Sequence, residues 1–560
     1  MQKKMLWFSV LIVGVLMSFL PFYSFVKDDM FISANYARSL VHGEGLTFAQ
    51  ERVEGFSNFA WVMVGTIPHL FEGGADVMVW FYRILSIIAA VFVGVGVMRL
   101  GAQYIRVLPQ AGENYSTRLI THAPALAAFA LLCATSIGYY IASGMETIAF
   151  TALCVWVLVY VGDHKYHAAL AMSVLAALTR PEGHIFVLVA AVATIGFVFR
   201  HQRFVVAIWS LLKYAMIPIA VLTSYHAWRW SYYGDLLPNT YYIKSSSGGL
   251  MSMGFDDLFK VFDLQAFIWF PLLSLFAVML VTVQSPRIGL RLGAHWLLGL
   301  FFFAYLVWVG GDEMAHGRML LPGLAIMAAL AGVAIWLVLT RVSKAWIVPI
   351  FSLMFVGVVC ASLYETRRVS AEYRTWYEDM KASQGALCQD LAMALPKGAL
   401  VAYQDMGFCP YITEDRLRFI DYIGLVTRPV AMLRHKLQIP MFGVVPIAGQ
   451  DSGSRRQQFW GQMCDLIFQQ EPSAIALLLR VDQPRREIMM QRDMLSATEF
   501  KDWIIRNTGS FGFSPGLQWD TRFQEYEIRG VFPRDQGGGH IYLVSFVRRT
   551  PIIAQVGNSL

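Results

Sequence analysis

The sequence carries few charged residues. Asp, Glu, Lys and Arg make up 15% of the 560 residues, whereas soluble globular domains carry about 25%. Hydrophobic residues make up 56% and include 39 Phe and 16 Trp. This composition argues against an ordinary soluble enzyme and indicates an integral membrane protein.

Short motifs of soluble catalysts are also missing. The chain contains no P-loop, no GxGxxG fingerprint and no nucleophile elbow, so no soluble nucleotide donor is indicated. Only six cysteines are present. Three of them, Cys388, Cys409 and Cys464, follow the last long apolar run, in a region where a disulfide is permitted if it lies outside the cytoplasm. The sequence leaves all three pairings open.

Long apolar runs are abundant instead. A helix crosses about 30 Å of hydrocarbon with roughly 17–25 residues, and we count about eleven candidate runs, of which the fourth, fifth and sixth are short. The first is too long for a signal peptide, and no small-x-small cleavage site follows it, so we expect a retained helix. The runs lie at 5–26, 77–98, 122–141, 147–162, 168–179, 184–199, 206–228, 264–284, 294–310, 319–340 and 345–364.

Lys and Arg in the short loops predict the orientation. With the N-terminus inside, alternate connections are basic, as the positive-inside rule requires. The opposite loops are acidic or Gly-rich, and eleven crossings place the C-terminal region outside. The net charge of +7 is then a property of the cytoplasmic loops and does not indicate nucleic-acid binding. We expect a multi-pass protein of the inner (cytoplasmic) membrane with its active site and C-terminal domain in the periplasm.

Two domains are predicted. Residues 1–364 form the transmembrane domain, in which 27–76 is the first periplasmic loop. Residues 365–560 are richer in charge and contain strand-like runs at 398–404, 474–480 and 540–549, so we expect a soluble α/β domain of ordinary size. The predicted fold class is a polytopic α-helical membrane protein with a C-terminal periplasmic α/β domain.

The polar motifs gather in the predicted outer loops. The first is DDMFIS, where Asp28 and Asp29 follow the first span. A carboxylate pair can simply mark the end of a span, but adjacent like charges raise the pKa of one carboxyl, a cost that a marker does not require. We therefore consider a general base or a metal ligand.

Two further motifs place arginines at span ends. Arg180 in TRPEGH is either a snorkelling side chain or a phosphate clamp beside Glu182, in a broken helix that lines a cavity. GDEMAHGR at 311–318 brings Asp312, His316 and Arg318 together. It reads either as a charged turn or as a site for phosphate and hydroxyl contacts, and its signal for a metal is weak.

The motif YYGDLLPNTYYIKS is rich in tyrosine. Tyr232 and Tyr233 open it, and Asn239 and Lys244 follow. The tyrosines fit an aromatic belt at the membrane interface. Alternatively, their faces stack on sugar rings while Lys244 meets a phosphate.

In their order along the chain, these motifs resemble those of bacterial C-type (GT-C) glycosyltransferases, and most of all the terminal arabinofuranosyltransferases of the cell envelope. The resemblance rests on DDMFISANYARSLVHGEGLTF, ERVEGFSN, SGMET, LTRPEGH, YYGDLLPNTYYIKS and GGDEMAHGRMLLP, and continues through VAYQDMGFCPYIT and FIDYIGLV. It covers most of the membrane part. No single motif is specific by itself; their common order is.

The resemblance implies a glycosyltransferase that moves a sugar, D-arabinofuranose by this likeness, from a polyprenyl-phosphate donor such as decaprenyl-phosphoarabinose to a glycan or protein acceptor of the cell envelope. Asp28 or Asp29 would be catalytic. The donor phosphate would be bound by Arg180, Lys244, His316 and Arg318. The remaining candidate substrate contacts are Glu54, Glu146, Glu182, Tyr232, Tyr233, Asn239 and Asp312.

Further expectations concern cofactors and partners. We expect no obligatory cofactor and no dedicated metal site, although a divalent metal is possible, and a monomer in the lipid bilayer with no nucleic-acid partner. The main alternative is a transporter or flippase of a polyprenyl-linked sugar. Transporters tend to show paired repeats and charges near the bilayer midplane, whereas the charges here lie at span ends. A non-catalytic sensor of glycans is a third interpretation.

Overall fold

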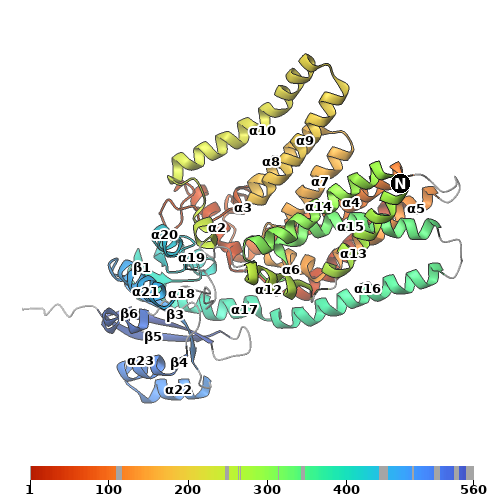
Figure 1. The fold of residues 1–560 in the computed structure, drawn as a ribbon. Helices are drawn as coiled ribbons and strands as arrows, with labels where there is room; N and C mark the ends of the chain where they lie inside the picture. The colour runs from red at the N-terminus through yellow and green to blue at the C-terminus, as the bar shows by residue number, and fades with distance from the viewer. Residues whose placement is uncertain are drawn as a thin grey trace, which may run out of the picture. The chain divides into compact units, whose positions relative to one another are not determined.

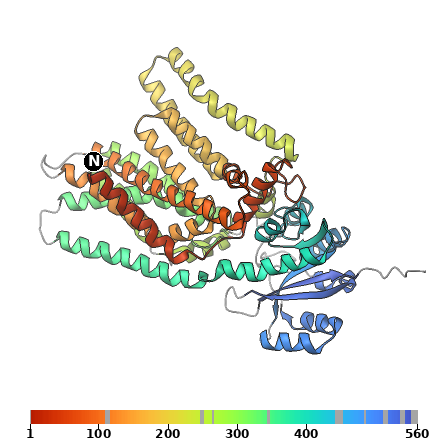
Figure 2. The ribbon, with the colours of Figure 1, turned by 180° about the vertical axis from the view of Figure 1, so that it is seen from behind.

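The fold was analysed in a computed structural model. The structure describes residues 2–108, 116–245, 251–262, 264, 266–312, 314–341, 347–439, 452–481, 485–509, 517–534 and 541–549. Its ribbon is drawn in Figure 1 and, from behind, in Figure 2.

The chain divides into two compact units. The first comprises 1–45, 56–238 and 247–376, and the second comprises 46–55, 239–246 and 377–560. Two short pieces of the membrane part therefore belong to the same compact unit as the C-terminal region.

The first unit is helical throughout its described part. Small residues allow its helices to approach closely: Gly323 of α15 (Leu321–Arg341) lies against the backbone of Gly299 in α14 (Pro286–Trp308), as is common where helices pack in a membrane. α15 is the central helix, and 83% of the residues in its apolar stretch are buried. The other main helices are α1 (Gln2–Phe19), α2 (Asp29–Val41), α3 (Phe59–His69), α4 (Ala75–Val107), α5 (Ser116–Leu132), α6 (Thr135–Ser143), α7 (Thr147–Gly162), α8 (Tyr166–Thr179), α9 (His184–His201), α10 (Phe204–Tyr233), α12 (Met251–Phe262), α13 (Ala266–Gln284) and α16 (Ile347–Ser370).

Each predicted apolar run lies mainly on one helix of this unit or, for 122–141, on a bent pair of helices. Fewer helices than predicted qualify as spans by length and hydropathy. Seven described helices do, and the bent pair His122–Leu132 and Thr135–Ser143 adds an eighth if it is one span. The helices α7 and α8 are apolar but shorter than 18 residues, and α16 is not among the seven. A count of runs exceeds the count of spans because a short apolar helix can be buried in protein without crossing hydrocarbon.

The second unit contains a six-stranded mixed sheet in the order β2-β1-β3-β6-β5, with β4 paired to β3. β1 pairs in parallel with β2 and β3, whereas β6 is antiparallel to β3 and β5. The predicted α/β fold is confirmed, and the three predicted strands correspond to β1, β3 and β6. The strands are β1 (Ala399–Tyr403), β2 (Leu417–Asp421), β3 (Ala474–Val481), β4 (Thr508–Gly509), β5 (Tyr526–Pro533) and β6 (Ile541–Arg548).

Helices flank this sheet on both sides. α20 (Arg428–Leu437), α21 (Ser452–Phe468), α22 (Arg485–Met494) and α23 (Ala497–Arg506) share one hydrophobic cluster with β3 and β6, to which α18 (Ala386–Ala394) and α19 (Phe408–Thr413) contribute no residue. β3 is apolar and almost fully buried along its length, as expected for a strand covered on both faces. Its core includes Tyr422, whose hydroxyl donates to the carbonyl of Ala476 at 3.1 Å.

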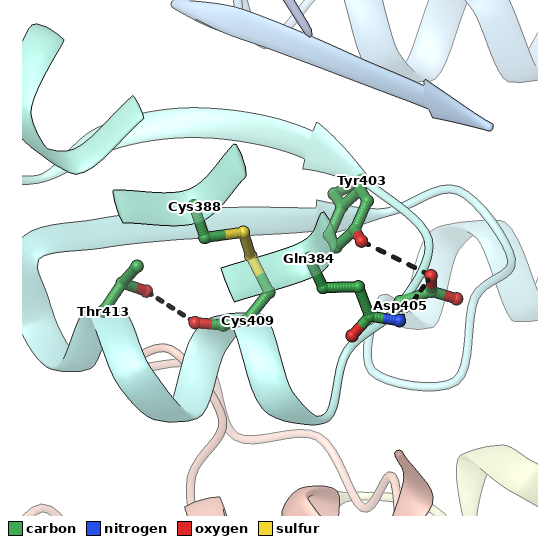
Figure 3. The surroundings of a disulfide bond; sticks show 6 residues. All are labelled: Gln384, Cys388, Tyr403, Asp405, Cys409 and Thr413. Carbon is green, nitrogen blue, oxygen red and sulfur yellow. Dashed lines mark hydrogen bonds between the residues drawn. A yellow bond between two sulfur atoms is a disulfide. The ribbon is translucent and has the colours of Figure 1, made fainter. Parts of the chain in front are cut away.

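A disulfide joins the segments that carry α18 and α19. Cys388 pairs with Cys409, which selects one of the three pairings that the sequence left open, while Cys464 is buried and free. Figure 3 shows the bond beside the end of β1.

Candidate functional site

The site is built where α6 ends and α7 begins, at the motif SGMET. Gly144 ends α6 at φ +75°, a conformation that side-chain-bearing residues rarely adopt. A Cβ at this position would also collide with Met30. The carbonyl of Gly144 accepts a hydrogen bond from Trp61 Nε1 at 3.1 Å. This fixed turn presents Glu146 at the start of α7.

Arg180 lies between two carboxylates. Its Nη1 is 2.7 Å from Glu146 Oε1, and its Nε and Nη2 donate to Glu182 at 3.2 and 2.9 Å. The side chains are 11%, 5% and 9% exposed for Arg180, Glu146 and Glu182, so this is a buried ion-pair network rather than a snorkelling arginine. One cation and two anions give the triad a formal charge of −1.

The second oxygen of Glu146 is also held. Asn58 Nδ2 donates to Glu146 Oε2 at 3.0 Å and lies 3.0 Å from Ser33 Oγ. Asn58 is the last residue of the ERVEGFSN motif and precedes α3, while Ser33 lies on α2. Both were missed as site residues because the sequence does not reveal which element faces Glu146.

The motif GDEMAHGR forms a second buried ion pair. Arg318 donates from Nε and Nη2 to the two carboxylate oxygens of Asp312 at 3.0 and 2.6 Å, and each side chain is 6% exposed. Two parallel bonds fix the guanidinium plane. Glu313 of this motif lies outside the described residues.

Tyr140 brings the two ion-pair groups together. Its hydroxyl donates to the carbonyl of Ala315 and lies within electrostatic range of Asp312, Arg318 and Arg180. The motifs SGMET, TRPEGH and GDEMAHGR, which lie between positions 143 and 318 of the sequence, therefore converge on one region of the first unit.

Asp28 and Asp29 stand at the start of α2, beside the end of α6. Both are partly exposed, and the backbone N–H of Lys27 donates to the carbonyl of Ser143 at 3.3 Å. Asp29 lies within electrostatic range of Tyr139, whose ring is 4.6 Å from that of His316. The aspartates thus border the same region as the ion pairs.

A buried arginine holds the chain segment that leads to these aspartates. Arg83 of α4 is 3% exposed. Its Nη2 donates to the carbonyl of Phe25 at 2.8 Å, and its Nε donates to the carbonyl of Ala142 at 3.2 Å. Arg83 therefore joins the segment before Asp28 to the last turn of α6. It was missed because it lies inside a long apolar run.

His316 is present as the neutral imidazole at pH 7. Burial lowers the pKa of His316 from 6.5 to about 4. Its Nε2 lies 3.3 Å from the hydroxyl of Tyr373, and the rings of both residues pack against Tyr139. As a neutral group, His316 can offer a phosphate a hydrogen bond but no positive charge.

The remaining predicted residues are distributed over both units. Tyr232 and Tyr233, at the end of α10 in the first unit, pack edge to face at 4.8 Å, and Tyr232 stacks on Trp228. Lys244 and Asn239 lie on α11 (Asn239–Ser245) of the second unit, where Lys244 is exposed.

Asn239 and Glu54 tie two loop segments together within the second unit. The backbone N–H of Asn239 donates to the carbonyl of Glu54 at 2.9 Å. The amide of Asn239 donates to the carbonyls of Gly424 and Leu425. Both residues are buried, and these bonds anchor 46–55 and 239–246 to the C-terminal part of the chain.

A further polar cluster, not predicted from the sequence, lies at the carboxyl end of β1. Asp405 accepts hydrogen bonds from Arg534 Nη1 at 2.8 Å, Gln384 Nε2 at 3.1 Å and the Tyr403 hydroxyl at 3.3 Å. Figure 3 shows Gln384 and Asp405 beside the disulfide. Each stands four residues before a bridged cysteine, so the bond between Cys388 and Cys409 holds the two segments in register.

The described residues contain no group of three or more His, Cys, Asp or Glu side chains placed to hold a metal ion. Chemically, the region in the first unit offers partly exposed carboxylates, two buried guanidinium groups and a neutral imidazole. Such a set can accept a proton at Asp28 or Asp29 and can stabilise an oxyanion nearby.

Comparison with known proteins found similarity to a curated protein. No family model matches the chain. The terminal beta-(1->2)-arabinofuranosyltransferase of Mycobacterium tuberculosis (strain ATCC 25618 / H37Rv) is 27% identical over 413 residues, which cover 65% of this chain. The match spans 62% of the length of that protein.

Solved structures of ArnT from Cupriavidus metallidurans are similar over nearly the whole chain. ArnT bound to undecaprenyl phosphate aligns with a TM-score of 0.51 and 14% sequence identity, covering 96% of this chain and 97% of ArnT. Its apo state aligns with a TM-score of 0.48 at 13% identity, covering 97% and 98%. The chain therefore has the fold of ArnT, a polytopic helical membrane protein of the GT-C type with a mixed α/β region at its C-terminal end.

Proposed function

We propose that this protein is a membrane glycosyltransferase that takes a sugar from a lipid-phosphate donor. The observation that carries the proposal is the convergence of Arg180 and Arg318, each buried in an ion pair, with the partly exposed pair Asp28 and Asp29. The ArnT-like fold and the arabinofuranosyltransferase relative support it, since ArnT was solved with undecaprenyl phosphate bound and the relative is named as a sugar transferase.

In the proposed reaction, a carboxylate of the DD pair accepts the proton of the acceptor hydroxyl as that oxygen attacks the anomeric carbon. The bond between the anomeric carbon and the phosphate oxygen breaks, and negative charge grows on the leaving lipid phosphate. Asp312 occupies the Nε and Nη2 edge of Arg318, so the Nη1 group is the part that can reach a phosphate oxygen. A preorganised guanidinium stabilises that charge most where water is excluded.

The carboxylate partners of the arginines have a positioning role in this scheme. A guanidinium held by two parallel hydrogen bonds loses little conformational freedom when it binds a further oxygen. Glu146, Glu182 and Asp312 thereby fix the orientation of the two guanidinium planes. His316 contributes a neutral hydrogen bond.

The donor sugar that we propose is D-arabinofuranose carried on a polyprenyl phosphate, with a cell-envelope glycan or protein as the acceptor. The relative's name is the support for this sugar. We further propose that the reaction takes place on the periplasmic side of the inner membrane. The basic residues of the alternate loops and the disulfide in the second unit favour this orientation.

A transfer assay tests the proposal. The purified protein is given a synthetic polyprenyl-phosphoryl arabinofuranose and a glycan acceptor, and Asp28→Asn and Asp29→Asn are compared with wild type. We expect at least one of them to lose turnover by roughly 100-fold or more, the scale of a general base. Asp163→Asn is the matched control, because Asp163 lies in the turn after α7 and accepts a hydrogen bond from Gln103. Full turnover in both aspartate variants would remove the DD pair from the mechanism.

The flippase alternative predicts a different outcome. A flippase would move the intact lipid-linked sugar across vesicles without cleaving it, and its activity would not depend on an acceptor. Release of free polyprenyl phosphate only when acceptor is present supports transfer, whereas translocation of uncleaved donor would favour the flippase.

A further inference from the structure

Two histidines on neighbouring helices of the first unit face each other through their Nε2 atoms. His184 begins α9, and His226 lies in the last third of α10. Their Nε2 atoms are 3.4 Å apart, and their ring centroids are 5.6 Å apart with planes inclined by 35°. Figures 1 and 2 show α9 and α10 side by side as consecutive helices.

A hydrogen bond to the backbone sets the tautomer of His184. Its Nδ1 donates to the carbonyl of Pro181 at 2.8 Å, so the neutral ring carries a lone pair on Nε2, directed at His226. This arrangement, in which one ring nitrogen donates to a carbonyl and leaves the other free, is the one that commonly orients metal-binding histidines.

The spacing of the two Nε2 atoms fits a weak direct hydrogen bond, and it also fits a shared metal ion. Hydrogen bonds from ring N–H groups are usually about 2.7–3.2 Å long, so 3.4 Å corresponds to a weak one. Two nitrogens bound to a tetrahedral zinc ion at about 2.1 Å each lie about 3.4 Å apart. The observed Nε2–Nε2 separation equals the distance in that second arrangement.

The surroundings of the two histidines carry charge. Both histidines lie on the surface of the first unit. Glu182, two residues before His184, belongs to the triad with Arg180 and Glu146 that has a formal charge of −1. Arg229 lies within electrostatic range of His226 and opposes a bare cation, which favours an anionic oxygen as a further ligand.

We propose that His184 and His226 form a two-histidine binding site for a transition-metal dication such as Zn²⁺. Since the described residues offer no third protein ligand there, water or an anionic oxygen of a bound molecule completes the tetrahedron. Such an open site differs from the closed four-ligand sites that serve only structure. The proposal concerns binding and does not depend on the sugar-transfer reaction.

The test is metal binding by the full-length protein, purified in detergent with a tag that contains no histidine and stripped with a chelator. Co²⁺ is the spectroscopic probe, because tetrahedral Co²⁺ absorbs visible light, and Zn²⁺ competition gives the affinity. His226→Gln keeps a polar side chain opposite His184 but removes the ring nitrogen. His201→Gln is the matched control, since His201 is also exposed on α9 and makes the same kind of Nδ1 bond, to Phe197 at 2.8 Å.

We expect wild type and His201→Gln to bind one more Co²⁺ per chain than His226→Gln, or to bind it at least about 10-fold more tightly, since even the loss of a supporting partner of a ligand costs about 10–100-fold. Equal stoichiometry and affinity in all three proteins would overturn the proposal. If His226→Gln does not fold, His184→Gln is read in the same way. A Zn²⁺-dependent rise in Tm for wild type and His201→Gln, absent in the site variant, is the second readout.

Discussion

Removing the guanidinium of Arg180 is the sharpest perturbation of the buried network. Arg180→Ala leaves Glu146 and Glu182, which are 5% and 9% exposed, without their shared cation. The formal charge of the triad changes from −1 to −2 in a buried region. Breaking a buried pair by removing one partner typically costs about 3–5 kcal/mol, so we expect the free energy of unfolding to fall by roughly that amount.

Neutralising a carboxylate should reverse part of this loss. Arg180→Ala combined with Glu146→Gln restores the charge of the triad to −1, and the glutamine can still accept the hydrogen bond from Asn58. We therefore expect the double variant to be more stable than Arg180→Ala alone, while transfer activity stays lost in both. Stability and activity would then be separated by a single added substitution.

The assay is denaturant unfolding in mixed micelles, with the same proteins checked for a monodisperse peak by gel filtration. Lys260→Ala is the control, because Lys260 pairs with Asp257 at the surface with 75% of its side chain exposed, and such pairs contribute about 0–1 kcal/mol. A loss for Arg180→Ala no larger than that of Lys260→Ala, or no gain from Glu146→Gln, would refute the account of the network.

Three other predictions address stability and positioning. Cys388→Ala should destabilise the second unit by about 3 kcal/mol, since the disulfide closes a loop with a sequence separation of 21. Cys464→Ser is the control, because Cys464 forms no disulfide, and it should leave the effect of reductant on stability unchanged. Thermal unfolding with and without reductant measures both. Arg83→Met should lower turnover more than it lowers donor affinity, because it releases the segment before Asp28; unchanged kcat would contradict this. The pKa of His316 is about 4 in the folded protein and about 6.5 in the unfolded chain. Because the unfolded state binds more protons between these values, stability should fall as the pH drops from about 6.5 to 4. His316→Gln should flatten that dependence in unfolding curves measured across this pH range.

The sequence was informative about the class of protein because hydropathy is a local property that adds up along a run. Each predicted apolar run lies mainly on one helix or, for 122–141, on a bent pair of helices. The α/β character of the C-terminal region followed from strand-like runs such as GALVAYQ. Span number was predicted less well, because whether a short apolar helix such as α7 faces lipid or protein depends on its neighbours.

The candidate site shows the same division between what the sequence predicts and what only the folded structure reveals. By itself, the sequence determined that carboxylates, arginines and histidines stand at the ends of apolar runs, where DDMFIS, TRPEGH and GDEMAHGR lie. Only the tertiary structure decided that Arg180 pairs with Glu146, 34 residues away, that Cys388 bonds Cys409, and that His184 meets His226 on the next helix. The physical reason is that residue type and local spacing fix what a segment can form. Ion pairs, disulfides and metal sites depend instead on distances between segments, which the packing of helices and strands determines.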